Sequence, residues 1–157
     1  MAPTLRTSVS ADRAAVLALA ARLADFTLPP GRTAAEIAAA DVHLFDAFYA
    51  APDDGTLFLV AEDGGTVLGT VLANIGEDYF THRPFAYVEV LAVAEAAAGR
   101  GIARRLLGAV EDWARQRGLA RVELSVFANN TRARGFYEHL GYREEFVRCV
   151  KTVVSSQ

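Results

Sequence analysis

Cysteine, lysine and long apolar runs are scarce or absent in this 157-residue sequence. The single cysteine, Cys149, excludes a disulfide framework and a cysteine-based zinc site, and in its late apolar run we expect it to be a small core residue. The 16 basic residues, of which only Lys151 is a lysine, are outnumbered by 19 acidic ones. This balance argues against a nucleic-acid partner.

Membrane and export signals are also missing. No apolar stretch approaches the ~20 residues that a membrane helix needs, and no signal-peptide pattern opens the chain. We therefore expect a cytoplasmic protein with no membrane partner. With 52% hydrophobic and 22% charged residues, the sequence is typical of one globular domain, which we place at residues 1–157.

Helical and strand patterns alternate along the chain without internal repeats. Apolar periodicity predicts strands at 4–9, 56–62, 66–75, 84–93, 120–127 and 143–154. It predicts helices at 10–24, 33–51, 101–116 and 130–140, with Ser10 as the N-cap of the first and Gly118 ending the third. The order β-α-α-β-β-β-α-β-α-β predicts a three-layer α/β fold, in which about four helices flank a mixed central sheet.

Two glycines, Gly99 and Gly101, separate the expected strand at 84–93 from the helix that follows it. The N-terminus of a helix offers unpaired N–H groups and the positive end of its dipole, and glycine lets the backbone approach a ligand closely. The turn is therefore a candidate anion site, with Arg100, Arg104 and Arg105 as the nearest cations.

Two common phosphate motifs do not fit this turn. A P-loop needs Lys-Ser or Lys-Thr after the glycines, and neither is present. In a dinucleotide-binding fingerprint Gly99 and Gly101 would be the first two glycines and Glu123 the ribose-binding acid, but Arg104 stands at the position of the third glycine. The turn also comes too late in the chain to open a dinucleotide-binding domain.

The run from Val93 to Leu107 resembles motif A of the GNAT N-acetyltransferase superfamily, [Q/R]-x-x-G-x-[G/A]. Gly101 and Ala103 fill its last two fixed positions, whereas Ala98 stands where the family prefers Gln or Arg. In relatives the backbone amides of this motif make most of the contacts to pyrophosphate, and Ala98 leaves those amides unchanged.

A second stretch, residues 124–142, is similar to the family's later signature: a strand, an asparagine, and a helix with a tyrosine before Leu-Gly-aromatic. Asn130 and Tyr137 take the expected places in it, and Leu140-Gly141-Tyr142 follows. The resemblance is specific over residues 85–145 and rests on element order alone before them.

The resemblance implies acetyl-CoA as co-substrate and no metal. In relatives two central parallel strands splay apart and admit the pantetheine arm, while the glycine turn holds the pyrophosphate. The cofactor-binding residues implied in this chain are Leu91, Ala92, Val93, Ala98, Gly99, Arg100, Gly101, Ile102, Ala103, Arg104, Asn130 and Tyr137. Asn130 could equally cap its helix.

Catalysis by direct attack of an amine on the thioester needs an acid for the departing thiolate and a route for the amine's proton. Tyr137 matches the tyrosine that relatives use as the acid, although it shares a helix face with apolar residues and could simply pack there. Glu89 is our candidate base or water-holder, because a charge in an apolar strand is costly without a partner or a task. A solvated glutamate is the alternative.

The acceptor is expected to be a cationic amine, since aromatic and acidic groups gather in the segments that bind substrate in relatives. The substrate-binding candidates are Phe26, Tyr49, Tyr79, Phe80 and Glu89. We expect a small-molecule amine N-acetyltransferase; a protein N-terminal or lysine acetyltransferase and a non-catalytic CoA-binding sensor remain as alternatives. The expected last strand, with Phe146, Val147 and Val150, could support a homodimer.

Overall fold

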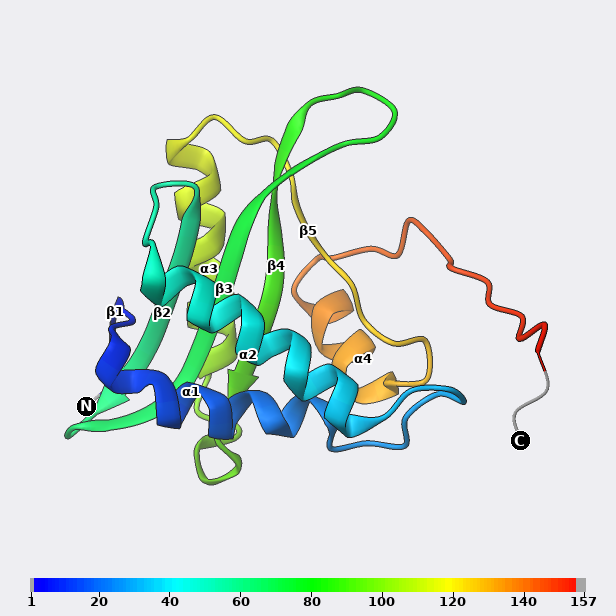
Figure 1. Ribbon diagram of the computed structural model, residues 1–157. Helices are drawn as coiled ribbons and strands as arrows, with labels where there is room; N and C mark the ends of the chain where they lie inside the picture. Colours follow the sequence, from blue (N-terminus) through cyan, green and yellow to red (C-terminus); the bar gives the residue numbers. More distant parts are fainter. Residues whose placement is uncertain (1, 155–157) are drawn as a thin grey trace.

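The computed structural model describes residues 2–154 and shows one five-stranded sheet between two layers of helices (Figure 1). The strands lie in the order β1-β2-β3-β4-β5. Neighbours are antiparallel except β4 and β5, which are parallel. The mixed sheet predicted from the sequence is confirmed. The strand bounds are β1 Thr4–Thr7, β2 Thr56–Asp63, β3 Thr66–Glu77, β4 Pro84–Val93 and β5 Val122–Leu124.

Four α-helices cover the two faces of the sheet, as predicted. Helices α1 (Arg13–Ala20) and α2 (Ala34–Ala50) lie on one face, over a core that includes Phe45 and Phe58. Helices α3 (Ile102–Gln116) and α4 (Thr131–His139) pack on the other face. Short 3₁₀ turns complete the chain: η1 Ser10–Asp12, η2 Ala21–Ala24 and η3 Glu95–Ala97.

Local capping explains several of the helix ends. Thr33 and Glu36 form a reciprocal capping box at the start of α2. Gly118, with φ of 69°, ends α3 as predicted. Ser10 does not cap the first helix: the chain enters α1 through η1, where the Asp12 carboxylate accepts the Val9 amide at 2.8 Å. The predicted cap was therefore wrong, because Ser10 lies inside η1 and the capping position before this turn is held by Val9.

A β-bulge in β4 shapes the centre of the sheet. Leu72 of β3 faces Val90 and Ala73 faces Val88, so Glu89 is the extra residue between them. On its other edge β4 pairs with β5 only over Ala86–Val88. Beyond this short ladder β4 continues to Val93 while the chain after β5 leaves the sheet, so the parallel strands splay as expected.

Two predictions for the chain's end were wrong. Residues 143–154 form no strand within the part of the chain that the structure describes, and Cys149 is exposed. The segment runs away from the sheet (Figure 1), held at its start by ion pairs from Arg121 to Glu145 and from Arg134 to Glu144. A strand exists only where a neighbour supplies backbone groups, and here none does. Residues 143–154 instead expose the apolar side chains of Phe146, Val147, Val150, Val153 and Val154.

Candidate active site

The glycine turn before α3 has the backbone shape that an anion site needs. Gly99 and Gly101 adopt φ of 79° and 74°, the left-handed region that favours glycine. The first backbone bond into α3 runs from the Arg105 amide to the Gly101 carbonyl at 3.1 Å. Within residues 2–154 the amides of Ile102, Ala103 and Arg104, which precede it, have no backbone acceptor. These three donors lie at the positive end of the helix dipole.

Close packing fixes where this helix begins. At Gly69 of β3 an added Cβ would stand 2.8 Å from the Ile102 side chain and 3.2 Å from that of Leu106. The absent side chain therefore lets the first turns of α3 approach the sheet. The free amides are held next to the point where β4 ends.

The three arginines of the turn face different partners. Arg100 bonds to Asp63 at 3.0 Å and so ties the turn to the β2–β3 hairpin. Arg105 donates to the Pro3 carbonyl at 2.6 Å, which directs it toward β1. Arg104 is exposed. Of the three, Arg104 is the cation that no contact within residues 2–154 restrains.

The exit of β4 carries Leu91, Ala92 and Val93, all beyond the last residue pair with β5. Leu91 and Val93 pack on the core beneath α3, and Ala92 is buried. The Val93 carbonyl accepts a hydrogen bond from the Arg22 guanidinium of η2. The predicted pantetheine-binding backbone thus lies beside the opening between the two splayed strands.

Asn130 and Tyr137 lie on the far side of that opening. The Asn130 side chain accepts the Ala133 amide at 3.3 Å and caps α4, so the capping role is confirmed. Tyr137 is half-buried, with ring centroids 5.5 Å from Phe136 and 5.9 Å from Tyr142. Burial raises the pKa of the Tyr137 hydroxyl above its ordinary value, which keeps the phenol protonated and able to donate at neutral pH.

The opposite face, beneath α2, carries two carboxylates. Glu89 is exposed on the bulge, and its Oε1 accepts from the Asn74 amide of β3 at 3.1 Å. Asp41 of α2 lies one turn before the buried Phe45 and so faces the sheet. Its Oδ2 is buried and has no hydrogen-bond partner within the described residues 2–154. Desolvation, with the charge of Glu89 as the smaller cause, raises the pKa of Asp41 to about 6.

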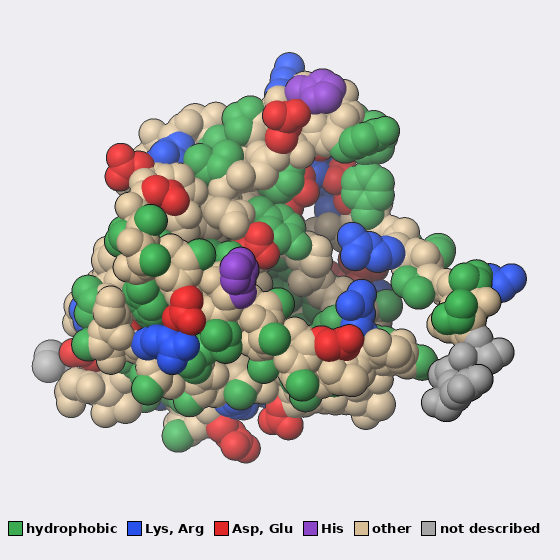
Figure 2. Space-filling view, in the orientation of Figure 1, with side chains coloured by type: hydrophobic (Ala, Val, Ile, Leu, Met, Phe, Trp, Pro, Cys, Tyr) green, Lys and Arg blue, Asp and Glu red, His purple; other side chains and the backbone are tan. Residues whose placement is uncertain are grey.

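Sequence reasoning selected Glu89 and missed Asp41. A usable signal existed, because an acid four residues before a core phenylalanine lies on the apolar face of its helix. Figure 2 shows the surface over this region hollowed between α2, the β3–β4 hairpin and the C-terminal segment. A cavity on the same face, bordered by Leu44, Leu72 and Asn74, has a volume of about 120 Å³. That is well below the ~300–1,000 Å³ of typical ligand pockets, so one copy of the chain does not enclose an acceptor there.

The four aromatic candidates for the acceptor site are not brought together. Phe26 packs on Phe127 in the coil after β5, with centroids 5.7 Å apart, and so lies by the splayed strands. Tyr49 instead stacks on Phe58 in the core and its hydroxyl bonds to Ser8 at 2.8 Å. These contacts give Tyr49 a packing role in the fold that requires no bound substrate.

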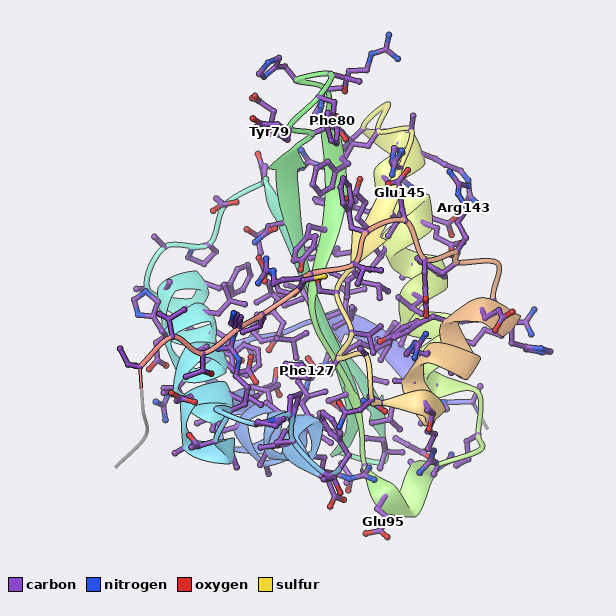
Figure 3. All side chains as sticks on the ribbon, turned by 90° about the vertical axis from the view of Figure 1, so that its right-hand side faces the viewer. Tyr79, Phe80, Glu95, Phe127, Arg143 and Glu145 are labelled. Atoms are coloured by element: carbon purple, nitrogen blue, oxygen red, sulfur yellow. The ribbon has the colours of Figure 1, made fainter. Side chains whose placement is uncertain are left out.

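Tyr79 and Phe80 project from the tip of the β3–β4 hairpin, far from Phe127 (Figure 3). They are 85% and 67% exposed, and Phe80 stacks in parallel on Phe146 at 5.8 Å. The Asp78 carboxylate fixes the tip by accepting two backbone amides. The structure therefore places these aromatics beside the C-terminal segment and away from Glu89.

The described residues contain neither a cluster of metal-binding side chains nor a membrane-spanning helix. Among residues 2–154, no three His, Cys, Asp or Glu side chains gather as a metal ion would require. Over the same residues, every helix falls short of the length or apolar character needed to cross a membrane.

Solved structures share this fold over nearly their whole length. A putative acetyl transferase from Pyrococcus furiosus has a TM-score of 0.76 and 24% identity, covering 96% of this chain and 99% of that one. An aminoglycoside antibiotic 6'-N-acetyltransferase, AAC(6')-IG from Acinetobacter haemolyticus, has a TM-score of 0.71 and 18% identity, covering 97% and 99%. AAC(6')-Iy, solved with the bisubstrate analogue CoA-S-monomethyl-acetylneamine, has a TM-score of 0.70 and 21% identity, covering 96% and 98%.

The family assignment rests on the sequence match as well as on the fold. The model of the acetyltransferase (GNAT) family matches residues 21–142, which include the glycine turn, Asn130 and Tyr137. The match extends back through α2 to η2, so it covers residues 21–84, part of the region where the motif resemblance rested on element order alone. The chain belongs to the acetyltransferase (GNAT) family and is an acyltransferase of that family.

Proposed function

We propose that this chain moves the acetyl group of acetyl-CoA to the primary amine of a small molecule, by direct attack within a ternary complex. The observation that carries the proposal is the alignment of three features along β4. The free amides of α3 lie at its end, the splay begins at its middle, and the bulged Glu89 stands at the start of that splay. Support for the donor also comes from the fold relative solved with a CoA-containing analogue.

The residues divide into donor and acceptor groups. The amides from Gly99 to Arg104 would hold the pyrophosphate, with Arg104 as the side chain free to approach it. The backbone of Leu91, Ala92 and Val93 would hold the pantetheine arm, and the Asn130 amide nitrogen, which capping leaves free, would bind the cofactor. Tyr137 would protonate the leaving thiolate, a task its raised pKa permits.

The proton on the amine is the main obstacle to the reaction. An alkylamine of pKa ~10.4 is neutral in about one molecule per thousand near pH 7.4, a handicap of ~4 kcal/mol. Glu89 would receive that proton, directly or through a water; in support, Asn74 bonds to only one of its two oxygens in the described structure. The amine can then attack the thioester carbonyl, while a backbone N–H stabilises the oxyanion.

A protein N-terminus or lysine is the second candidate acceptor. The observation that favours it is the open acceptor face, since an extended peptide needs a groove more than a closed pocket. A non-catalytic CoA sensor has less support, because it would not need a protonated, half-buried tyrosine beside the splay. The cytoplasmic location stays a prediction from the sequence.

We further propose that the C-terminal segment pairs with a second copy of this chain. Five aliphatic or aromatic side chains on residues 143–154 are 72–86% exposed, and Tyr79 and Phe80 add to the same surface. The sequence there is strand-like, and the outer edge of β5 has no neighbour in the described sheet. A copy supplying that strand would also help to close the acceptor face. Light scattering after size exclusion should give a dimer that Val150→Asp makes monomeric; a wild-type monomer would refute this.

The function is tested by thiol release from acetyl-CoA across a panel of amines, with wild-type protein and Tyr137→Phe. We expect turnover of at least one amine, reduced at least tenfold in the variant with acetyl-CoA affinity unchanged. Tyr142→Phe is the matched control, since Tyr142 is a similarly buried neighbour whose hydroxyl bonds to Glu111. If the protein binds acetyl-CoA but acetylates none of the small amines, the result would favour a protein acceptor or a non-catalytic sensor. Absence of binding would refute the donor site.

A further inference from the structure

Asp41 differs from Asp12, Asp46 and Asp63 in having no cationic partner among the residues that the structure describes. Asp12 bonds to Arg6 at 2.8 Å, Asp46 to Arg13 at 2.7 Å and Asp63 to Arg100 at 3.0 Å. Within residues 2–154, Asp41 makes no ion pair and no side-chain hydrogen bond, although its Oδ2 is buried. A buried carboxylate without donors is costly, so this arrangement weakens the fold unless something else occupies the position.

The surroundings of Asp41 identify the kind of occupant. Glu89, from the bulge of β4, is the charged neighbour that adds to the raised pKa of Asp41, and within residues 2–154 neither carboxylate forms an ion pair with a cation. Asn74 supplies a donor to Glu89 Oε1 alone, which leaves the second oxygen of Glu89 free. The missing component is a group that is positively charged and offers several N–H donors.

We propose that Asp41 and Glu89 together bind the ammonium form of the acceptor, with Asp41 on α2 as a specificity-determining residue for cationic amines. An ammonium group has three N–H donors and can bond to one oxygen from each carboxylate at once. Asp41 holds the cation against α2, and Glu89, which lies nearer the splay, then takes up the proton that the amine loses. This inference rests on the proposed function and selects charged over neutral acceptors.

The geometry of the fold supports this division of roles. Glu89 belongs to β4, the strand whose far end leads into the glycine turn, and its side chain is exposed at the bulge. Asp41 lies on the helix that covers this face and is anchored by Phe45, which is fully buried one turn later. A rigid helix is therefore expected to keep the Asp41 carboxylate fixed while substrate enters from the hollowed surface (Figure 2).

The test compares wild-type protein with Asp41→Asn and Asp46→Asn. Asp46 is the matched control, because it lies on the same helix, is half-exposed and has its own arginine partner. The acceptors are amino sugars, diamines and short alkylamines, each beside its hydroxyl analogue, at saturating acetyl-CoA. We expect Asp41→Asn to raise the KM for charged amines about tenfold or more, the effect of losing one charge-assisted hydrogen bond, with kcat within threefold. Asp46→Asn should leave both constants unchanged.

Calorimetric titration of the same panel into the CoA-loaded proteins separates failure of this inference from failure of the proposed function. Amines that bind wild-type protein but not Asp41→Asn, while their hydroxyl analogues bind neither, support the ammonium position even without turnover. Equal affinity and equal KM in wild type and Asp41→Asn overturn it, whether or not acetyl transfer occurs. Failure of every amine to bind wild-type protein overturns it as well. Asp41→Ser serves as the second variant, should the asparagine variant not fold.

Discussion

Replacing Asp41 by asparagine should make the ligand-free protein more stable at neutral pH. The substitution keeps the shape of the side chain and removes a charge that is half-buried, faces Glu89 and has no donor in the described structure. Most substitutions of half-buried residues destabilise a protein, so a gain here is a specific expectation. It follows from the electrostatics of this one position.

The size of the effect follows from the raised pKa. A rise in the pKa of Asp41 from 3.8 to about 6 corresponds to ~3 kcal/mol at ~1.36 kcal/mol per pKa unit. Because the side chain is only part-buried, solvent screening reduces this to ~1–2 kcal/mol. The folded state holds the proton more tightly than the unfolded state, so stability is fully retained below pH 3.8. It falls as the pH rises toward about 6 and is then constant.

Urea unfolding at pH values from 4 to 8 measures this directly. Asp41→Asn should match wild type near pH 4 and exceed it by ~1–2 kcal/mol at pH 7 and above, which in a chain of this size raises Tm by about 2–8 °C. Asp46→Asn, which loses the ion pair with Arg13, should show no such gain at any pH. A difference that does not vary with pH, or a less stable Asp41→Asn at pH 7, would refute the reasoning.

Three further substitutions test the packing and the ion pairs. Gly69→Ala should cost ~1–3 kcal/mol and weaken acetyl-CoA binding, because the new methyl group displaces the start of α3. Gly108→Ala, in open space within the same helix, should instead add ~0.5–1 kcal/mol; chemical denaturation and calorimetric titration measure both. The ion pair with Arg6 lowers the pKa of Asp12, so its stabilisation is complete above pH 3.8 and is lost as the pH falls below that value. Urea curves of wild type and Asp12→Asn should therefore converge in acid.

Much of the fold was predictable because its signals are local. The strand at 84–93 was predicted with its observed bounds, since β-branched residues run between a proline and a glycine-containing turn. The helix after the turn combines left-handed glycines at its start with an apolar stripe that includes Leu106 and Val110. Such patterns depend on neighbours in the sequence and hold whatever the rest of the chain does.

The last strand could not be predicted from local pattern alone. Residues 143–154 have the composition of a strand, but a strand also requires an edge to pair with, and the segment meets none in the described chain. The short length of β5 has a related cause. Its residues after Leu124 turn toward α4 at the point where β4 bulges, so the ladder ends three pairs after it begins. Both outcomes depend on partners distant in sequence.

Residue type alone did not predict where the aromatic candidates for the acceptor site lie. Tyr49, Tyr79 and Phe80 were selected because aromatic rings suit a cation, yet one packs in the core and two lie on the hairpin tip. Glu89 was selected on a physical argument, the cost of a charge in an apolar strand. The structure shows how this cost is avoided: Glu89 lies at the bulge, and its side chain is exposed there.

The cost of a charge in apolar surroundings is visible at both Asp41 and Glu89. Glu89 avoids this cost because it lies at a β-bulge, where one residue of β4 has no pairing partner in β3. At Asp41 the cost remains: its pKa is raised, and its Oδ2 has no hydrogen-bond donor within the described residues. Neither feature improves the packing of α2 on the sheet, which a neutral side chain at position 41 would serve better. Without a ligand, the wild-type chain should therefore have a lower free energy of unfolding than a chain with a neutral residue at position 41. If a cation fills the position, binding returns that stability, and amines should raise the Tm of wild-type protein more than that of Asp41→Asn.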